Sequence, residues 1–360
     1  MIFRRRKPPL TLHIGLGKTG TTVLQEFFWA NRDQLAKHGV DYPDYGVVAG
    51  AHHLLSPHAP ADLKRSWNFI PVEKWAPRLA KRKSASILLS SELIAAAELE
   101  VVNDFAATLS QHFLPRIVAY VRRQDDLIMA SYNQNVKTGK QRRKLVDVYP
   151  NMLHRFDYPK LLAPWAQTIG QENIVVRPYE RSQFHAGDLR YDFLYHLFGV
   201  DDYEHFTQSN EDPNPRLSPR AVEYKRLLNN VVEDPGKLRR FQALLTQYSI
   251  DHAQSSGVAR EQFSPEQRVE ILASYEEGNR EIARTYLNRP DGRLFVDELP
   301  APDAPWDEKP LVTAQAREIT AYLREQDPKL IGWLESALPD FVEDEKYGPR
   351  SSARFLTATL

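Results

Sequence analysis

The 360-residue sequence contains no cysteine, which excludes disulfide bonds, thiolate metal sites and cysteine-based catalysis and is consistent with a reducing compartment. It also lacks an excess of either charge, because lysine plus arginine and aspartate plus glutamate number 47 each. No global field therefore favours nucleic acid or an acidic membrane surface. The sequence predicts no nucleic-acid partner, and any anion site has to be local.

Long apolar runs are missing as well. The longest fall short of the ~20 residues that a membrane-spanning helix needs, so we expect no transmembrane segment. Residues 1–10 form a leader in which Arg4 to Lys7 precede two prolines, whereas a signal peptide would continue with an apolar core. We expect a cytoplasmic protein, with peripheral contact of the leader at the inner membrane face as a second option.

The most informative stretch that is present is TLHIGLGKTGTTVLQEFF, from Thr11 to Phe28. It has the pattern of a short apolar strand, a glycine loop and an amphipathic helix. Three glycines between Gly15 and Gly20 carry no Cβ, so the backbone can approach a ligand closely. A helix that starts at Thr21 would add free N–H groups and the positive end of a helix dipole, and the stretch therefore predicts a phosphate site.

The loop differs from a nucleotide-binding Walker A loop in the position of its lysine. Aligning Gly15 and Gly20 with the two glycines of that motif places Thr21 at the lysine position and Thr22 at the Ser/Thr position. The lysine lies inside the loop instead, at Lys18. Kinases use this lysine on the β- and γ-phosphates and the hydroxyl on Mg²⁺, so the displaced lysine indicates a different activated group at the 5′ end of a nucleotide.

The segment KTGTTVLQ, residues 18–25, resembles the K-[ST]-G-T-T-x-L loop of sulfotransferases that use 3′-phosphoadenosine 5′-phosphosulfate (PAPS). The resemblance covers about residues 10–199 and implies an α/β protein with the P-loop-like sulfotransferase fold: three α/β/α layers around a central parallel sheet, with additional C-terminal helices. It also implies PAPS as the sulfuryl donor and no required metal. The loop residues that would bind the donor are Gly17, Lys18, Thr19, Gly20, Thr21 and Thr22. A generic phosphate loop or a tight strand-to-helix turn is the alternative.

A second signature follows a predicted strand at 115–121. Arg123 ends this strand and Ser131 lies eight residues later, on the expected helix. An arginine at a strand end and a serine two turns along the next helix can converge on one phosphate. In the family that the loop resembles, such a pair holds the 3′-phosphate of PAPS. The alternative is that Arg123 pairs with an acidic neighbour and Ser131 is incidental.

A third similarity lies after the predicted strand at 173–177, where Tyr179 and Glu180 match the family's Y-E-D region. The resemblance implies that Tyr179 lies near the adenine. The R-K-G-x-x-G loop that completes the 3′-phosphate site in cytosolic members is absent from the sequence. The chain is therefore more similar to bacterial carbohydrate-type sulfotransferases, and part of the 3′-phosphate site stays unassigned.

Candidates for a general base lie beside the second predicted strand, residues 86–91, which ends at Glu92. In open parallel sheets, ligands bind outside the carboxyl ends of the strands, so Glu92 should border the same crevice as the glycine loop. Members of the family that the loop resembles use a histidine or a glutamate near the end of this strand as the general base, and this resemblance makes Glu92 the first candidate. His52 and His53, in the preceding loop at 45–68, are the second, and no third residue nearby completes a metal site. The alternative for Glu92 is an acid in the first turn of a helix at 93–99.

The expected chemistry is in-line sulfuryl transfer, in which positioning and charge stabilisation supply most of the catalysis. Lys18 would neutralise charge as the phosphosulfate bond breaks, while backbone N–H groups of the loop hold the 5′-phosphate. The acceptor is a hydroxyl, with a carbohydrate or glycolipid favoured and a small alcohol or peptide tyrosine open. Aromatic residues between 42 and 75 could stack on sugar rings or simply pack. A P-loop small-molecule or sugar kinase and a non-catalytic nucleotide-binding protein are the alternative functions.

The expected organisation is a leader at 1–10, a sulfotransferase domain at 11–299 and a C-terminal helical extension at 300–360. Within the domain, 11–200 forms the PAPS-binding α/β core and 201–299 a helical part. We expect a helix at 152–169, and another from Ser264 that buries Val269 and Ile282. An amphipathic helix at 312–338, broken at Pro328, follows in the extension. A homo-oligomer is open.

Overall fold

The computed structural model describes residues 6–57, 68–95, 99–208, 215–252, 262–299, 301–304, 306, 311–343 and 350–360. The chain forms two compact units, and each is assembled from stretches that are distant in sequence. The first contains the described residues up to Arg123 and those within 156–213 and 274–298. The second contains those within 124–155, 214–273 and 299–360.

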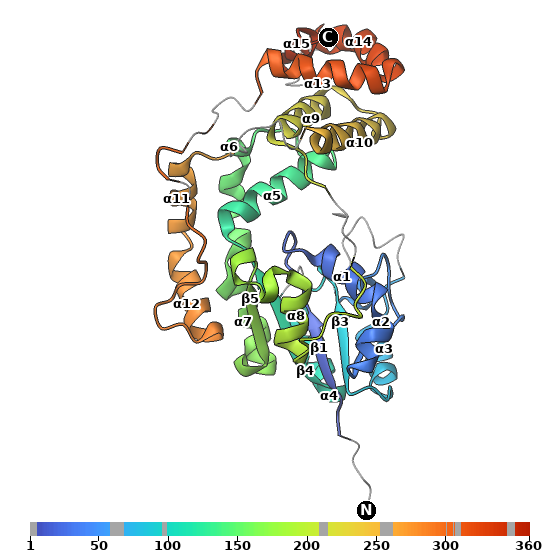
Figure 1. Ribbon diagram of the computed structural model, residues 1–360, viewed down its shortest axis with the longest axis vertical. Coiled ribbons are helices and arrows are strands. Elements are labelled where there is room, and N and C mark those ends of the chain that lie inside the picture. Colours follow the sequence, from blue (N-terminus) through green and yellow to red (C-terminus); the bar gives the residue numbers. More distant parts are fainter. Residues whose placement is uncertain are drawn as a thin grey trace, which may run out of the picture. The chain divides into compact units, whose positions relative to one another are not determined.

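A five-stranded parallel sheet lies at the centre of the first unit (Figure 1). Its strands are β1 (Pro9–His13), β2 (Val40–Asp41), β3 (Ser86–Ser90), β4 (Leu114–Val121) and β5 (Ile174–Pro178). The order is β2-β3-β1-β4-β5. The strand segments expected from apolar runs are confirmed to within a few residues, since a parallel sheet that is buried on both faces requires such runs. The two-residue edge strand β2 is too short to give this signal.

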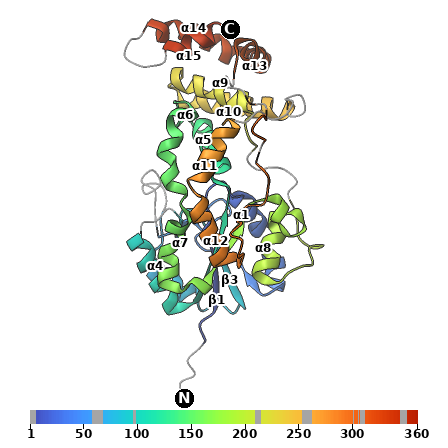
Figure 2. The same ribbon diagram turned by 90° about the vertical axis from the view of Figure 1, so that its left-hand side faces the viewer.

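Helices cover both faces of the sheet (Figure 2). One face packs against α1 (Thr21–Ala30), α2 (Arg32–Lys37) and α8 (Leu189–Phe198), whose apolar side chains surround the buried Phe28 and Phe193. The other packs against α3 (Val72–Leu79), α4 (Leu99–His112) and α7 (Tyr158–Ile169), where Trp75, Phe105 and Trp165 are buried. The helix α12 (Glu276–Leu287) lies beside α7 and β5. The expectation of a parallel sheet between helices is therefore confirmed.

The strand order identifies where a ligand would bind. Strands β2 and β3 lie on one side of β1, and β4 and β5 lie on the other. The connections therefore diverge at the carboxyl end of β1, and this switch point is where open α/β sheets bind ligands. The glycine loop follows β1 directly, so the chain topology places it at this crevice.

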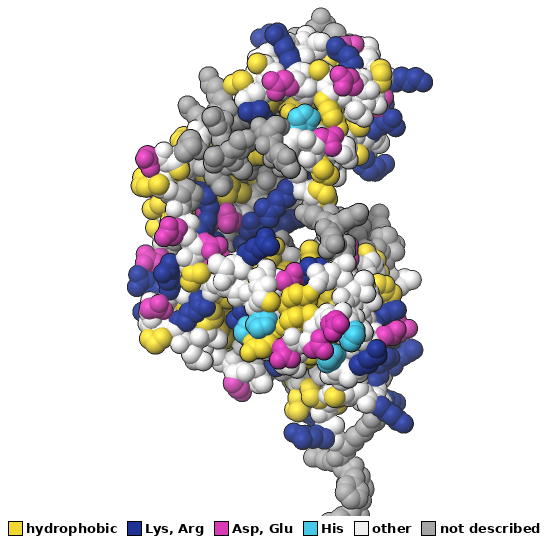
Figure 3. All heavy atoms as spheres, viewed as in Figure 1, with side chains coloured by type: hydrophobic (Ala, Val, Ile, Leu, Met, Phe, Trp, Pro, Cys, Tyr) yellow, Lys and Arg dark blue, Asp and Glu magenta, His cyan; other side chains and the backbone are white. Residues whose placement is uncertain are grey.

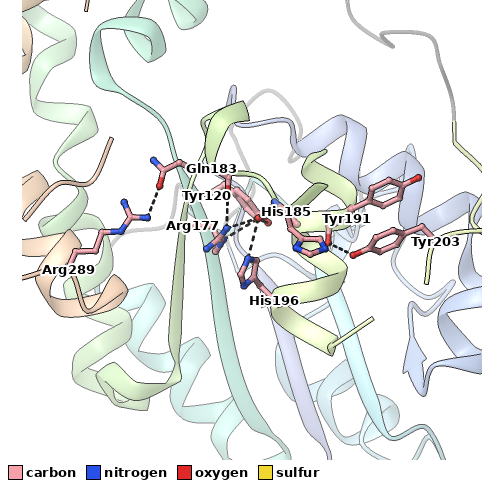
Figure 4. Close-up of polar contacts among 9 residues, drawn as sticks. Tyr120, Arg177, Gln183, His185, Tyr191, His196, Tyr203 and Arg289 are labelled. Atoms are coloured by element: carbon pink, nitrogen blue, oxygen red, sulfur yellow. Dashed lines mark hydrogen bonds and ion pairs between the residues drawn. The ribbon is translucent and has the colours of Figure 1, made fainter. Parts of the chain in front are cut away.

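A buried ionic network attaches α8 to the sheet. The carboxylate of Asp192 is fully buried and accepts hydrogen bonds from the Tyr120 hydroxyl at 2.7 Å and from Arg177 Nη2 at 2.6 Å. His196 Nε2 lies 3.5 Å from the same carboxylate, and Figure 4 shows the three partners pointing toward one another. Burial and the Asp192 charge raise the pKa of Tyr120 well above its usual value. The network replaces the solvation that Asp192 loses on burial.

The second unit is helical in its described residues. Its helices are α5 (Gln124–Lys137), α6 (Leu145–Val148), α9 (Pro219–Val231), α10 (Pro235–Asp251), α11 (Pro265–Ala273), α13 (Thr313–Gln326), α14 (Pro328–Glu343) and α15 (Arg350–Thr357). Arg268 on α11 is buried and bonds Asp125 at 2.6 Å and Asp126 at 3.0 Å. A hydrogen bond of 2.8 Å between Tyr224 and Thr320 joins α9 to α13.

Three expectations about helices are decided by the structure. The helix at 312–338 with a break at Pro328 is confirmed as α13 and α14. The single helix from Ser264 is wrong, because it ends at Ala273 and α12 starts separately; Val269 is 50% exposed, whereas Ile271 is buried. The helix expected from residue 152 begins only at Tyr158, where the Asp157 side chain caps its first turn after a 3₁₀ segment.

The surface mixes side-chain types. Figure 3 shows basic, acidic and hydrophobic side chains interspersed on the visible face of each unit, as the balanced composition implies. Among the helices that the structure describes, none has both the length and the apolar character needed to cross a bilayer.

Replacing Asp192 by Asn should destabilise the first unit. The Arg177 guanidinium would lose its buried counter-charge, and breaking such a pair costs about 3 kcal/mol or more. We expect a lower urea midpoint for Asp192→Asn, while Asp201→Asn at an exposed position changes the free energy of unfolding by less than about 0.5 kcal/mol. Equal midpoints for the two variants would contradict the assigned role of the network.

Candidate functional site

The glycine loop curls tightly between β1 and α1. Gly15, Lys18 and Gly20 have positive φ angles of 46°, 68° and 74°. A lysine in this region of backbone space is uncommon, and it lets the loop fold back before the helix begins at Thr21. The first turn of α1 has neither a side-chain cap nor an acidic residue. Its leading N–H groups, which no helix can pair internally, are thus arranged to meet an anion.

Glu92 lies directly against one side of this loop. A Cβ atom added to Gly15 would lie 3.2 Å from the Cα of Glu92 and 2.9 Å from the methyl group of Thr21. Only glycine allows this close approach, so the first glycine of the motif is needed for packing. The contact brings the first candidate base to the loop, as expected for residues that follow adjacent parallel strands.

Tyr179 and Leu189 form the other side. A Cβ atom at Gly20 would lie 2.3 Å from Leu189 Cδ2 and 3.0 Å from the Tyr179 ring. At Gly17, in contrast, an added Cβ would meet nothing within 4 Å. The loop therefore packs at both ends and is open in the middle, which leaves room for a ligand to approach its backbone.

The Glu92 side chain is 35% exposed and is oriented by two neighbours. Gln25 Nε2 donates a hydrogen bond of 2.9 Å to Glu92 Oε2, and His53 Nε2 lies 3.7 Å from Oε1. Residues 92–95 form turns and a bend, and α4 begins only at Leu99, so the alternative of a helix at 93–99 does not hold for residues 93–95; residues 96–98 lie outside the described part. Glu92 is thus not an acid in the first turn of a helix there.

The two histidines have different environments. His52 is fully buried: its Nε2 lies 2.8 Å from the carbonyl oxygen of Pro43, and its Nδ1 accepts the Ser90 N–H at 3.2 Å. Burial lowers the pKa of His52 to about 4. Both ring nitrogens are engaged by backbone, so His52 stabilises the loop on β3 and does not face a ligand. His53 is the one beside Glu92; burial lowers its pKa, and the Glu92 charge opposes this shift.

Two arginines follow β4 directly, and the sequence analysis assigned a role to only one of them. Arg122 Nη1 donates to the carbonyl oxygen of Lys18 at 3.1 Å, and its guanidinium lies 5.6 Å from the centre of the Tyr179 ring. Arg123 is 8% exposed, and its Nη1 makes a long 3.4 Å bond to the Asp297 carbonyl. Ser131 lies on α5 in the second unit, so its pairing with Arg123 stays a prediction.

A segment that the sequence analysis did not assign also borders the site. The buried Glu180 carboxylate accepts the backbone N–H groups of Val296 at 2.8 Å and Asp297 at 3.3 Å. Gln183 accepts a 2.7 Å bond from Arg289, and Figure 4 shows this pair. These contacts hold residues 289–297 beside the Tyr179 strand end and Arg123. The sequence feature that could have indicated this segment is the turn RPDGR at 289–293, which has an arginine at each end. It does not match the R-K-G-x-x-G pattern.

The aromatic residues expected near an acceptor mostly pack. Tyr42 is 2% exposed and donates to the Gly50 carbonyl, and Trp75 is fully buried. Tyr45 lies under the guanidinium of Arg78 at 4.3 Å. Trp67 lies outside the described residues. Among the residues that are described, no group of three or more His, Asp or Glu could hold a metal ion.

Comparison with known proteins adds one relative. The chain is 27% identical over 183 residues to a protein of Archaeoglobus fulgidus that is described only as uncharacterized. The match covers 51% of this chain and 49% of that relative, so the chain spans about half the relative's length. No family model and no solved structure matches the chain.

Stability should fall in acid because of two buried histidines. Burial lowers the pKa of His13 to about 3 and that of His52 to about 4. The unfolded chain binds these protons below about pH 6.5, so each histidine removes about 1.4 kcal/mol of stability per pH unit as the pH falls below that value. His52→Gln should therefore reduce the slope of unfolding free energy against pH. Measured with urea between pH 6.5 and about 4.5, the slope should fall by about 1.4 kcal/mol per pH unit. A His52→Gln variant with the same slope as the native chain would contradict the assignment.

Glu180→Gln should loosen residues 289–297. A neutral amide accepts weaker hydrogen bonds than a carboxylate, by about 1 kcal/mol. We expect faster hydrogen exchange at the amides of Val296 and Asp297, with no change at Phe28 in the core. Unaltered exchange at both amides would show that the Glu180 charge does not hold the segment.

Proposed function

We propose that the protein is a PAPS-dependent sulfotransferase that sulfates a hydroxyl group of a carbohydrate or glycolipid. One observation carries the proposal: four separate segments bring Lys18, Glu92, Tyr179 and Arg122 to a single loop at the switch point of the sheet. The loop sequence KTGTTVLQ, which resembles the 5′-phosphosulfate loop, supports the same function. No nucleic acid takes part, and the protein acts in the cytoplasm, with peripheral membrane contact or self-association as further options.

The residues of the loop fit the proposed donor. The open middle at Gly17 and the uncapped first turn of α1 leave backbone N–H groups of Thr19–Thr22 for the 5′-phosphate. The Thr19 hydroxyl donates to the Leu16 carbonyl and fixes the loop from within. Tyr179, which packs against Gly20, would border the adenine, while Arg123 and Ser131 would take the 3′-phosphate.

PAPS supplies an activated sulfuryl group that passes to the acceptor oxygen. Lys18 and the N-terminus of α1 place positive charge at the donor phosphate, where negative charge increases during transfer, so this charge need not come from a metal. Glu92, with His53 beside it, faces the same loop and is partly exposed, so it can take the proton of an acceptor hydroxyl. His52, although proposed beside His53 from sequence, contributes by holding the loop on β3.

A kinase is the second candidate, because Thr22 is exposed at the position where a kinase hydroxyl would bind Mg²⁺.

Calorimetry distinguishes the two functions by comparing the affinity for PAP, the desulfated product, with the affinity for ADP in the presence of Mg²⁺. We expect tighter binding of PAP without metal. Arg123→Ala should weaken it roughly tenfold or more, the loss typical of a hydrogen bond to a charged group. The exposed control Arg239→Ala should leave PAP affinity unchanged.

Tighter binding of ADP with Mg²⁺ than of PAP would contradict the sulfotransferase proposal and support the kinase. A chain that binds PAP but transfers no sulfuryl group to any hydroxyl acceptor would be a nucleotide-binding protein without this activity.

A further inference from the structure

A chain of hydrogen bonds lies beneath the glycine loop and ends on Glu92. Gln25, in the second turn of α1, has its Nε2 atom 2.9 Å from Glu92 Oε2 and 3.3 Å from Ser90 Oγ. Ser90 Oγ in turn lies 2.8 Å from His13 Nδ1. Gln25 is 4% exposed, and Ser90 and His13 are fully buried. Three of the four members are therefore shielded from water.

Chemistry fixes the direction of the two Gln25 bonds. An ionised carboxylate only accepts, so Gln25 must present its amide nitrogen to Glu92. The second amide hydrogen then points to Ser90 Oγ, which accepts it. The next bond joins Ser90 Oγ and His13 Nδ1, and its donor depends on the tautomer of the histidine. The reverse orientation of the amide would place the Gln25 oxygen against the carboxylate.

The His13 ring is neutral near neutral pH, because burial lowers its pKa to about 3. A neutral imidazole holds no additional proton that it could deliver along the chain to Glu92. The four groups therefore form an orienting chain and not a proton relay.

The other oxygen of Glu92 faces His53. Ser91 Oγ accepts the Leu93 N–H at 3.3 Å and lies 2.9 Å from His53 Nδ1, so the histidine ring is held in place. His53 Nε2 lies 3.7 Å from Glu92 Oε1. A bare nitrogen lone pair would be repelled by the carboxylate, so the tautomer with its proton on Nε2 is favoured there.

The polar character of Gln25 needs a reason, because its helix neighbours Leu24, Phe27 and Phe28 are buried in the core. A buried amide that is hydrogen-bonded adds little net stability, whereas one without partners costs about 1–3 kcal/mol. An apolar residue would serve packing alone at least as well. The position therefore favours a role that depends on the direction of the amide.

We propose that Gln25 is a positioning residue for the general base: its amide orients the Glu92 carboxylate relative to the glycine loop. The loop leads directly into α1, so one rigid helix fixes both the donor-binding backbone and the orientation of the base, as a site that needs near-ångström precision requires. The inference rests on the proposed sulfotransferase function. Gln25 acts through Glu92 and does not itself touch the reacting atoms.

The test compares Gln25→Met, which has similar length but no donor, with the native chain and with the same change in a Glu92→Gln background. Transfer of labelled sulfuryl groups from PAPS is followed with octyl glucoside and free hexoses as acceptor probes, and PAP affinity is measured in parallel. We expect kcat to fall about tenfold or more while PAP affinity changes less than about twofold. In the Glu92→Gln background, Gln25→Met should cause no further loss, because the group through which it acts is gone.

Two further variants keep the result decisive. Gln34→Met removes the bond from the α2 glutamine to the His205 carbonyl and should leave kcat unchanged. If Gln25→Met does not fold, Ser90→Ala, which removes the acceptor of the second amide hydrogen, should lower kcat with PAP affinity unchanged.

The outcomes separate this inference from the function on which it rests. Unchanged kcat in the folded Gln25→Met and Ser90→Ala variants, or an equal fall when Glu92 is already Gln, would overturn the positioning role and leave the sulfotransferase intact. A native chain that neither binds PAP nor transfers label would overturn the proposed function, and this inference with it.

Discussion

The close packing of the glycine loop between Glu92 and Tyr179 is the constraint on which the rest of the site depends. Gly15 and Gly20 stand where any Cβ atom would collide with these flanking elements, while Gly17 between them faces open space. The loop is thus held at both ends and free in the middle. Such a loop offers its backbone N–H groups to a ligand without having to reorganise, which is the basis of electrostatic preorganisation.

The helix α8 supports the Gly20 end of the loop. Leu189, at its start, packs on Gly20, and Asp192, about one turn later, is bound by Arg177 and Tyr120 from β5 and β4. A buried ionic network is costly to desolvate, but its geometry is specific, so it fixes the position of α8 on the sheet more sharply than apolar packing alone. On the opposite side, Gln25 and His53 fix the orientation of Glu92 in the same directional way.

Much of the fold could be predicted because local patterns determine it. The apolar runs of β3 and β4 and the break at Pro328 each have a cause within a few neighbouring residues. Prediction failed where tertiary contacts decide. The helix from Ser264 ends at Ala273 and α12 starts separately, although the apolar pattern continues. The two-residue β2 is a strand only because β3 lies beside it.

The sequence by itself determined that a glycine loop with an internal lysine joins a strand to a helix, and it indicated the residues that could do chemistry there. Only the tertiary structure distinguished His52, with both ring nitrogens bound to backbone, from His53, which faces Glu92. It alone brought Arg122 to the loop and residues 296–297 to Glu180 and Arg123. The physical reason is that periodicity and capping act over a few residues, whereas the environment of a side chain depends on which distant segments the sheet order places beside it.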